Sequence, residues 1–303
     1  MNDKIIIRYF DRREGLLKTE RVHAGKFLHW SYNMSLGRVA TELIFRQKLV
    51  SRLYGWLHKQ QLSKRKIKPF VQKMGTNLDE LTRPIEDFTC FNDFFTREID
   101  LSKRSINQNP CVCIAPVDGK ILAYGVVEPD MTFRIKRSTF NLRGFLQDAT
   151  LLNKFSEGSM VVSRLCLTDY HHFHFPDSGI PGEAISVRGK YYASGPYGLR
   201  ALIPFYTQNY RVLTLFDSDH FGQIAIVEIG AFTVGSIQQR YQSGRLIAKG
   251  ARNGFFELGG STVVLLFEKG RIELDKDLVT NTKNEVETYV LLGDSIGRTP
   301  KRR

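Results

Sequence analysis

The sequence predicts an α+β fold in which a β-rich core follows a basic, helical N-terminal region. Residues 26–78 have a largely helical pattern, with breaks expected at Pro69 and Gly75. From Cys111 onward, short β-rich runs alternate with Gly, Pro, Asn and Asp. Helices and strands that occupy separate parts of a chain are typical of α+β proteins.

The chain is long enough for one large domain or two ordinary ones, with 303 residues. Its content of 42% hydrophobic and 25% charged residues is typical of a folded globular protein. No clear linker divides it. We expect an N-terminal helical region at 1–90 and a β-rich core at 91–303.

The expected elements begin with a strand at Ile5–Ile7 and a polar turn at Asp11–Gly15. The helical region follows, and Asn92–Arg97 closes it. The strands expected after that point are bounded by turn residues. They are Cys111–Ala115, Lys120–Val127, Met160–Leu167, Ile185–Tyr192, Arg211–Phe216, Gln223–Gly230, Thr262–Phe267 and Tyr289–Leu292.

The net charge of +13 comes from two segments. Leu43–Leu78 contains nine Lys and Arg but no Asp or Glu, and Ser295–Arg303 adds four more Arg and Lys without an acid. The other 258 residues are neutral overall. The excess therefore indicates two local basic surfaces.

The first basic segment contains a predicted amphipathic helix. Its apolar side carries Leu43, Val50, Tyr54 and Leu57, with Leu53 beside them, and its opposite side carries Lys48, Arg52 and Lys59. Packing of the apolar side on the core is the ordinary explanation for such a helix. The absence of acids favours an anionic partner, because a face of one sign repels itself. Nucleic acid and an anionic membrane surface both fit.

The sequence predicts no transmembrane helix and no signal peptide. The longest stretch without a charged residue, Ser105–Val117, has thirteen residues, whereas a span needs roughly 20. Met1–Phe10 has no apolar h-region. The four cysteines form no C-x-x-C pair, which fits a reducing compartment. We therefore expect a cytoplasmic location.

The first candidate site motif is Ala115–Ile121, in which Asp118 precedes Gly119 between two apolar runs. Asp-Gly after a strand is a common hairpin signal. Turn chemistry therefore explains this motif when it is taken alone.

The second motif, Asp169–Pro176, holds three of the seven histidines. In an extended segment His172 and His174 share one face, and His171 points to the other. Alternate histidines on a strand are able to chelate a metal, but no third ligand follows by spacing, so we expect no metal site. Three histidines together with an Asp favour a functional role.

The third motif, Phe255–Phe267, places Gly259, Gly260 and Ser261 before a predicted buried strand. A glycine hairpin explains the glycines. A phosphate loop does not fit, because no Lys follows and no helix begins there. The three motifs supply Asp, His and Ser, as an orienting group, a base and a nucleophile require. The G-x-S-x-G elbow of hydrolases is absent.

These motifs resemble those of the pyruvoyl-dependent phosphatidylserine decarboxylases, in the bacterial branch with a Gly-Gly-Ser-Thr processing site. The resemblance covers most of the chain, and its motifs follow the family's order at similar spacing. They are Tyr9–Arg12, Leu36–Arg38, Phe91–Arg97, Pro116–Gly119, Asp169–His174, Val234–Ile237 and Gly259–Thr262.

The resemblance implies that the chain is a proenzyme that cuts itself between Gly260 and Ser261. By this analogy His174, oriented by Asp118, takes the proton of Ser261. The serine oxygen then attacks the Gly260 carbonyl. Ser261 would end as a pyruvoyl group, which supplies the electrophilic carbonyl that the unmodified chain lacks.

The implied products are a large chain, 1–260, and a small chain, 261–303, that begins with the pyruvoyl cofactor. This group would form a Schiff base with phosphatidylserine and release CO2 to give phosphatidylethanolamine. The resemblance makes His171 the implied proton donor to the product carbon.

The implied partners are phosphatidylserine, an anionic membrane surface and the two chains of the same precursor; a homo-oligomer is left open. We expect a peripheral protein on the cytoplasmic face of the cell membrane. Each Lys or Arg near such a surface strengthens membrane binding by about 1 kcal/mol.

Two alternative functions remain. If the chain were a soluble decarboxylase of a free amino acid, the acid-free basic helix would have no explanation. A nucleic-acid-binding protein leaves the histidines and Gly-Gly-Ser-Thr unexplained, so we expect no nucleic acid partner.

Overall fold

The computed structural model describes residues 8–20, 30–31, 34–41, 47–130, 133–135, 138–192, 205–230, 237–258 and 261–301. The predicted strand Ile5–Ile7, Leu43 of the apolar stripe and Gly260 of the cleavage site lie outside these residues. The described residues form an α+β fold with a large β-sheet core, which confirms the predicted fold class.

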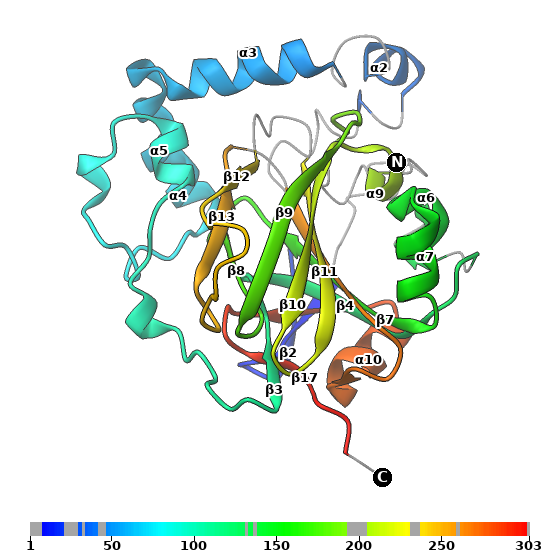
Figure 1. The fold of residues 1–303 in the computed structure, drawn as a ribbon. Helices are drawn as coiled ribbons and strands as arrows, with labels where there is room; N and C mark the ends of the chain where they lie inside the picture. Colours follow the sequence, from blue (N-terminus) through cyan, green and yellow to red (C-terminus); the bar gives the residue numbers. More distant parts are fainter. Residues whose placement is uncertain are drawn as a thin grey trace.

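The largest sheet has nine strands in the described chain (Figure 1). β1 is parallel to β16, and the other neighbours in this sheet are antiparallel. The strand order is β2 (Leu16–Thr19), β1 (Arg8–Asp11), β16 (Glu287–Val290), β4 (Gly119–Val127), β7 (Gly158–Leu165), β14 (Ser261–Phe267), β11 (Gly222–Gly230), β10 (Arg211–Ser218) and β9 (Gly179–Val187).

The strands predicted at Arg211–Phe216, Gln223–Gly230 and Thr262–Phe267 are confirmed as β10, β11 and β14. β14 lies between β7 and β11 and is buried along its whole length. Burial on both faces favours a continuous apolar run, and Val263–Phe267 is such a run.

The strand predicted at Ile185–Tyr192 is wrong over most of its length. β9 instead covers Gly179–Val187 and includes Pro181 and Gly182, which are typical of turns. β9 is the last strand in the described order of the sheet. Proline is tolerated in such an edge strand because one side of the backbone has no partner strand.

Smaller sheets complete the described β structure. One is formed by β12 (Ile237–Gln239), β13 (Arg252–Phe256) and β8 (His172–His174), which confirms that the histidine segment is extended. The rings of Phe173 and Phe256 lie 4.9 Å apart in the main core, so this sheet packs on the large one. The other strands are β15 (Glu273–Leu274), β17 (Ser295–Arg298), β3 (Val112–Ile114), β5 (Phe133–Ile135) and β6 (Ser138–Phe140).

The helices lie around the sheets, with α3 along one end of the molecule and the C-terminus at the opposite end (Figure 1). No described helix is both long and apolar enough to cross a membrane. The helices are α2 (Ser35–Ala40), α3 (Lys48–Lys59), η2 (Gln61–Lys66), α4 (Ile67–Met74), η3 (Ile85–Asp87), α5 (Phe91–Phe95), η4 (Leu101–Lys103), α6 (Leu142–Leu146), α7 (Ala149–Phe155), α9 (Phe205–Gln208) and α10 (Lys276–Lys283).

One of the two predicted helix breaks is wrong. Pro69 lies in the first turn of α4, where proline is tolerated. Gly75 ends α4 with a φ of 70°, in the left-handed region that glycine adopts at helix ends. Ile67 and Phe70 of α4 join α5 in a second hydrophobic cluster.

α3 is amphipathic, but its apolar side faces solvent. Of the predicted stripe, Leu53 is 56% exposed, Leu57 is 50% exposed and Tyr54 is 38% exposed, whereas Val50 is half-buried. Leu49 and Trp56, which lie outside that stripe, are also exposed. Ser51 and His58, which are polar, are the buried side chains. The ordinary explanation, that the stripe packs on the core of this chain, is therefore excluded for Leu53 and Leu57.

The division at residue 90 stays a prediction. β1 and β2 come from before that point, and β1 pairs with β16 near the C-terminus. The hairpin that contains the predicted Asp11–Gly15 turn therefore extends the main sheet.

Candidate active site

Ser261 is the first residue of β14 and lies between two neighbouring strands. It is paired with Gly230 of β11 and with Leu165 of β7. Its side chain is fully buried, and its Oγ has no hydrogen-bond partner among the described residues. An unsatisfied buried hydroxyl costs about 1–3 kcal/mol, so its presence needs an explanation.

The chain just before Ser261 is held by the helical region. The Leu258 N–H donates to Asn92 Oδ1 of α5 at 3.0 Å, and the Leu258 side chain is buried in the aromatic cluster of α4 and α5. Glu257 forms an ion pair with Lys59 of α3 at 2.6 Å. Three helices, α3, α4 and α5, thus hold the segment that leads to the predicted cleavage site.

Asp118 lies at the turn before β4, and its carboxylate is bound by a residue that the sequence analysis did not identify. Arg104 donates to both carboxylate oxygens at 2.7 and 3.2 Å, and the Leu292 N–H donates at 2.8 Å. Burial raises the pKa of Asp118, and the bonds and charge of Arg104 oppose that effect. Within the described chain, no hydrogen bond joins Asp118 to His174.

His174 lies next to the Asp118 turn through its backbone. Its N–H donates to the Pro116 carbonyl at 2.8 Å. Its Nδ1 lies 2.8 Å from the Gly250 carbonyl, so Nδ1 carries the proton, and Nε2 is 3.4 Å from the Tyr170 hydroxyl. Burial lowers the pKa of His174 to about 4, so the ring is neutral at pH 7.

One ring nitrogen of His171 is buried and has no hydrogen-bond partner in the described chain. Its Nδ1 donates to the Asp169 carbonyl at 2.9 Å, and its buried Nε2 has no partner in the described chain. The Phe95 ring centre is 3.9 Å from the imidazole. Burial, followed by the charge of Arg97, lowers the pKa of His171 to about 3. Nε2 is therefore a lone-pair acceptor at neutral pH.

Arg97 holds the loop that carries His171. Its buried guanidinium donates to the carbonyls of Thr168 and Asp169. The Asp169 carbonyl therefore accepts from both Arg97 and His171. Arg97 and Asn92 were visible only as members of the Phe91–Arg97 motif, and Arg104 had no sequence signal.

The small sheet brings the histidine segment and the segment before Ser261 together. Phe255 of β13 is paired with His172, and the Phe256 N–H donates to the His171 carbonyl at 2.9 Å. From Phe256 the chain runs on to Ser261 in β14. In the described ranges, no three His, Cys, Asp or Glu side chains are placed to hold a metal ion. The chemistry that these groups support is proton transfer around a serine hydroxyl.

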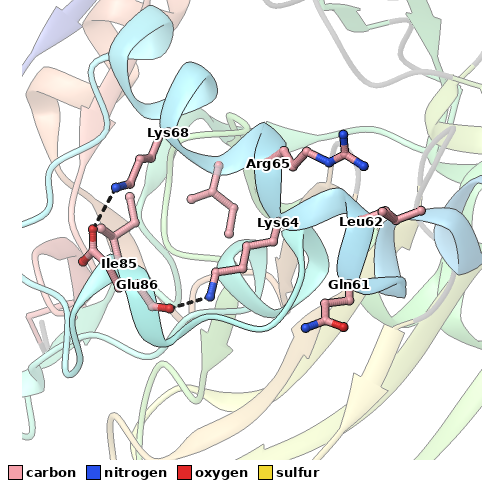
Figure 2. A pocket seen from close by; sticks show the side chains of 8 residues that line it. Gln61, Leu62, Lys64, Arg65, Lys68, Ile85 and Glu86 are labelled. Atoms are coloured by element: carbon pink, nitrogen blue, oxygen red, sulfur yellow. Dashed lines mark hydrogen bonds and ion pairs between the residues drawn. The ribbon is translucent and has the colours of Figure 1, made fainter.

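A cavity of about 470 Å³ is lined by residues of the basic segment together with Ile85 and Glu86 (Figure 2). Lys68 pairs with the Glu86 carboxylate at 3.1 Å, and Lys64 donates to the Glu86 carbonyl. The cavity is lined by residues of η2, α4 and η3: Gln61, Leu62, Lys64, Arg65, Ile67, Lys68, Ile85 and Glu86. It contains none of the predicted catalytic side chains.

Replacing Arg104 with alanine is expected to destabilise the fold by about 3–5 kcal/mol, because Asp118 would stay buried without its cation. Urea unfolding measures this loss. Arg143→Ala, which breaks the exposed ion pair with Asp130, is the matched control and should change stability by less than about 1 kcal/mol. Equal, small losses in both variants would contradict a structural role of Arg104.

The sequence is similar to curated proteins over 96–98% of its length. The profile of the family described as phosphatidylserine decarboxylase matches residues 91–298. The phosphatidylserine decarboxylase proenzyme of Desulfitobacterium hafniense is 38% identical over 298 residues, covering 98% of this chain and 100% of the relative. The proenzymes of the same name from Clostridium beijerinckii and Chlamydia caviae are 39% and 38% identical, covering 96% and 97% of this chain and 99% and 98% of those relatives.

Proposed function

The chain belongs to the phosphatidylserine decarboxylase family and is a carboxy-lyase, and we propose that it converts phosphatidylserine to phosphatidylethanolamine after cutting itself between Gly260 and Ser261. The observation that carries the self-cleavage is the orphaned, buried Oγ of Ser261 at the start of β14. A reaction that consumes this hydroxyl explains why it is kept unsatisfied.

The residues around Ser261 fit a pyruvoyl group in that position. The group would be held at the end of β14, between Gly230 and Leu165. When formed, it supplies an electron-withdrawing carbonyl for the decarboxylation. The small chain, 261–303, would stay bound to the large chain, 1–260, because β14 is paired on both sides with strands of the large chain.

In the proposed cleavage, His174 takes the proton of Ser261. The proton on Nδ1 faces Gly250, which leaves Nε2 as the acceptor. Asp118 is then a positioning residue. It does not bond the ring, but it fixes the turn whose Pro116 carbonyl binds the His174 backbone. Arg104 supports this role by holding the Asp118 carboxylate.

His171 is the proposed proton carrier for the decarboxylation. The amine of the substrate must lose a proton before it reacts with a carbonyl, and the bare Nε2 of His171 is able to accept it. The same nitrogen then returns the proton to the carbon that lost CO2. The Arg97 and Asp169 contacts keep the proton of the neutral ring on Nδ1, so Nε2 stays available.

We further propose that α3 meets the anionic membrane on the cytoplasmic face. Its exposed apolar side and the basic segment around it fit an interfacial helix. The Lys59–Glu257 ion pair connects this helix to the segment before Ser261. The proposed lipid-binding helix thus contacts the segment that leads to Ser261.

Replacing Leu49 and Leu53 with glutamate is expected to release the protein from anionic vesicles. Each leucine contributes about 1.5–3 kcal/mol when buried in lipid, so the double variant should bind at least tenfold more weakly. Vesicle flotation measures this, and binding of the unaltered chain should weaken as salt rises. Leu246→Glu is the matched control, since Leu246 is 72% exposed outside α3.

Flotation of the double variant at the level of the unaltered chain would contradict the membrane role of α3. Failure of the unaltered chain to float, together with turnover of free serine, would instead favour a soluble amino acid decarboxylase.

A further inference from the structure

A buried carboxyl group lies on the same face of the main sheet as Ser261, and the proposed function leaves it unused. Glu228 of β11 is paired with Val263, and Gly230 is paired with Ser261. Directly paired residues project to the same face, as do residues two apart on one strand. Glu228 is therefore a diagonal neighbour of Ser261, about 7–8 Å away between Cα atoms and within reach of a long side chain.

Two amides from the small sheet hold the Glu228 carboxyl group. Gln239 Nε2 donates to one oxygen at 3.1 Å, and Asn253 Nδ2 donates to the other at 3.4 Å. The amide oxygens of Gln239 and Asn253 are themselves buried without partners in the described chain.

The surroundings of Glu228 favour its protonated form at neutral pH. It is fully buried, and burial raises its pKa to about 8. Among the described residues no charged side chain pairs with it. Among the described residues its charge acts on Tyr241, whose pKa is raised by burial and further by Glu228.

The conversion of Ser261 to a pyruvoyl group needs a proton on this face. Serine Cβ carries two hydrogens, whereas the methyl carbon of pyruvoyl carries three. After the acyl shift, the α-proton passes to water and Oγ leaves Cβ within the Gly260 carboxylate, which creates a carbon–carbon double bond. Cβ then takes a proton, water adds at Cα, and ammonia leaves.

We propose that Glu228 donates the proton that Cβ of residue 261 takes up. This inference rests on the proposed self-cleavage. The O–H bond of Glu228 breaks, a C–H bond forms at Cβ, and the nitrogen lone pair forms a carbon–nitrogen double bond. The carboxylate regains a proton from water. One water is consumed overall, and no oxidant or reductant is needed.

Glu228→Gln is expected to separate chain cutting from ketone formation. The amide keeps the size of the side chain but lacks the acidic proton. Samples of freshly synthesised precursor are taken at successive times and quenched with borohydride. Chain cutting is followed on a denaturing gel, and the small chain is weighed intact. Borohydride reduces an imine end to alanyl and a ketone end to lactyl, whereas the enamine end that precedes proton uptake at Cβ is not reduced and keeps the mass of dehydroalanyl. Cutting should keep its normal rate, while the lactyl end should appear about tenfold later or more.

The pH profile distinguishes a proton donor from a structural residue. In the unaltered chain, ketone formation should slow as the pH rises past 8, where Glu228 loses its proton, and the Gln variant should be flat. Glu228→Asp should restore part of the rate. Asp177→Asn, which changes a buried carboxylate held by Ser218 and Lys249, is the matched control and should behave like the unaltered chain.

Ketone formation at the normal rate in the Gln variant would overturn the proposal, as would an equal delay of cutting and ketone formation. If the variant does not fold, a flat profile of the unaltered chain across pH 8 would also overturn it. A small chain that begins with unmodified Ser261, or no cutting at all, would instead remove the proposed self-cleavage.

Discussion

Ser261→Ala is expected to leave a single uncut chain of 303 residues without decarboxylase activity. Alanine has no oxygen to attack the Gly260 carbonyl, and no pyruvoyl group is able to form from it. Folding should be kept, because the lost Oγ makes no hydrogen bond in the described chain. Removal of an unsatisfied buried hydroxyl is close to neutral or stabilising. Intact mass and a denaturing gel check the first part, and CO2 release checks the second.

Ser163→Ala provides the matched control for this experiment. Ser163 lies on β7, is fully buried, and also has an unpartnered Oγ in the described residues. It is paired with Val263, two residues from Ser261 on the same face. This variant should be cut as the unaltered chain is. Two fragments from Ser261→Ala would refute the self-cleavage.

His171→Ala is expected to be cut normally but to lose turnover by about 10²–10⁴-fold, the usual contribution of one proton-transfer group. The proposed cleavage uses His174, whereas the bare Nε2 of His171 serves the later reaction. Processing is measured on a denaturing gel, and turnover is measured with phosphatidylserine in vesicles. The loss should fall on kcat rather than on vesicle binding.

Two further histidine variants serve as comparisons for His171→Ala. His220→Ala removes a partly exposed imidazole that pairs with Asp177, so it should affect neither measurement. His174→Ala should instead accumulate uncut precursor. Normal turnover in His171→Ala would remove that residue from the mechanism, and normal cutting in His174→Ala would assign the base elsewhere.

Much of the fold and part of the candidate site could be predicted from the sequence. β10, β11 and β14 lie where apolar runs are bounded by turn residues, because strand burial is a property of neighbouring residues. β9 was misplaced because Pro181 is acceptable only at a sheet edge, and edge position depends on the order of strands. Asn92 and Arg97 were within a recognised motif, but their contacts were not predictable.

The sequence by itself determined the α+β class, the amphipathic α3 and the Asp, His and Ser motifs, since these depend on local patterns and residue types. Only the tertiary structure decided that Arg104 binds Asp118, that the α3 stripe faces outward, and that Glu228 shares a face with Ser261. The reason is that periodicity defines which residues share a face. What covers that face is set by strand register and packing between distant segments.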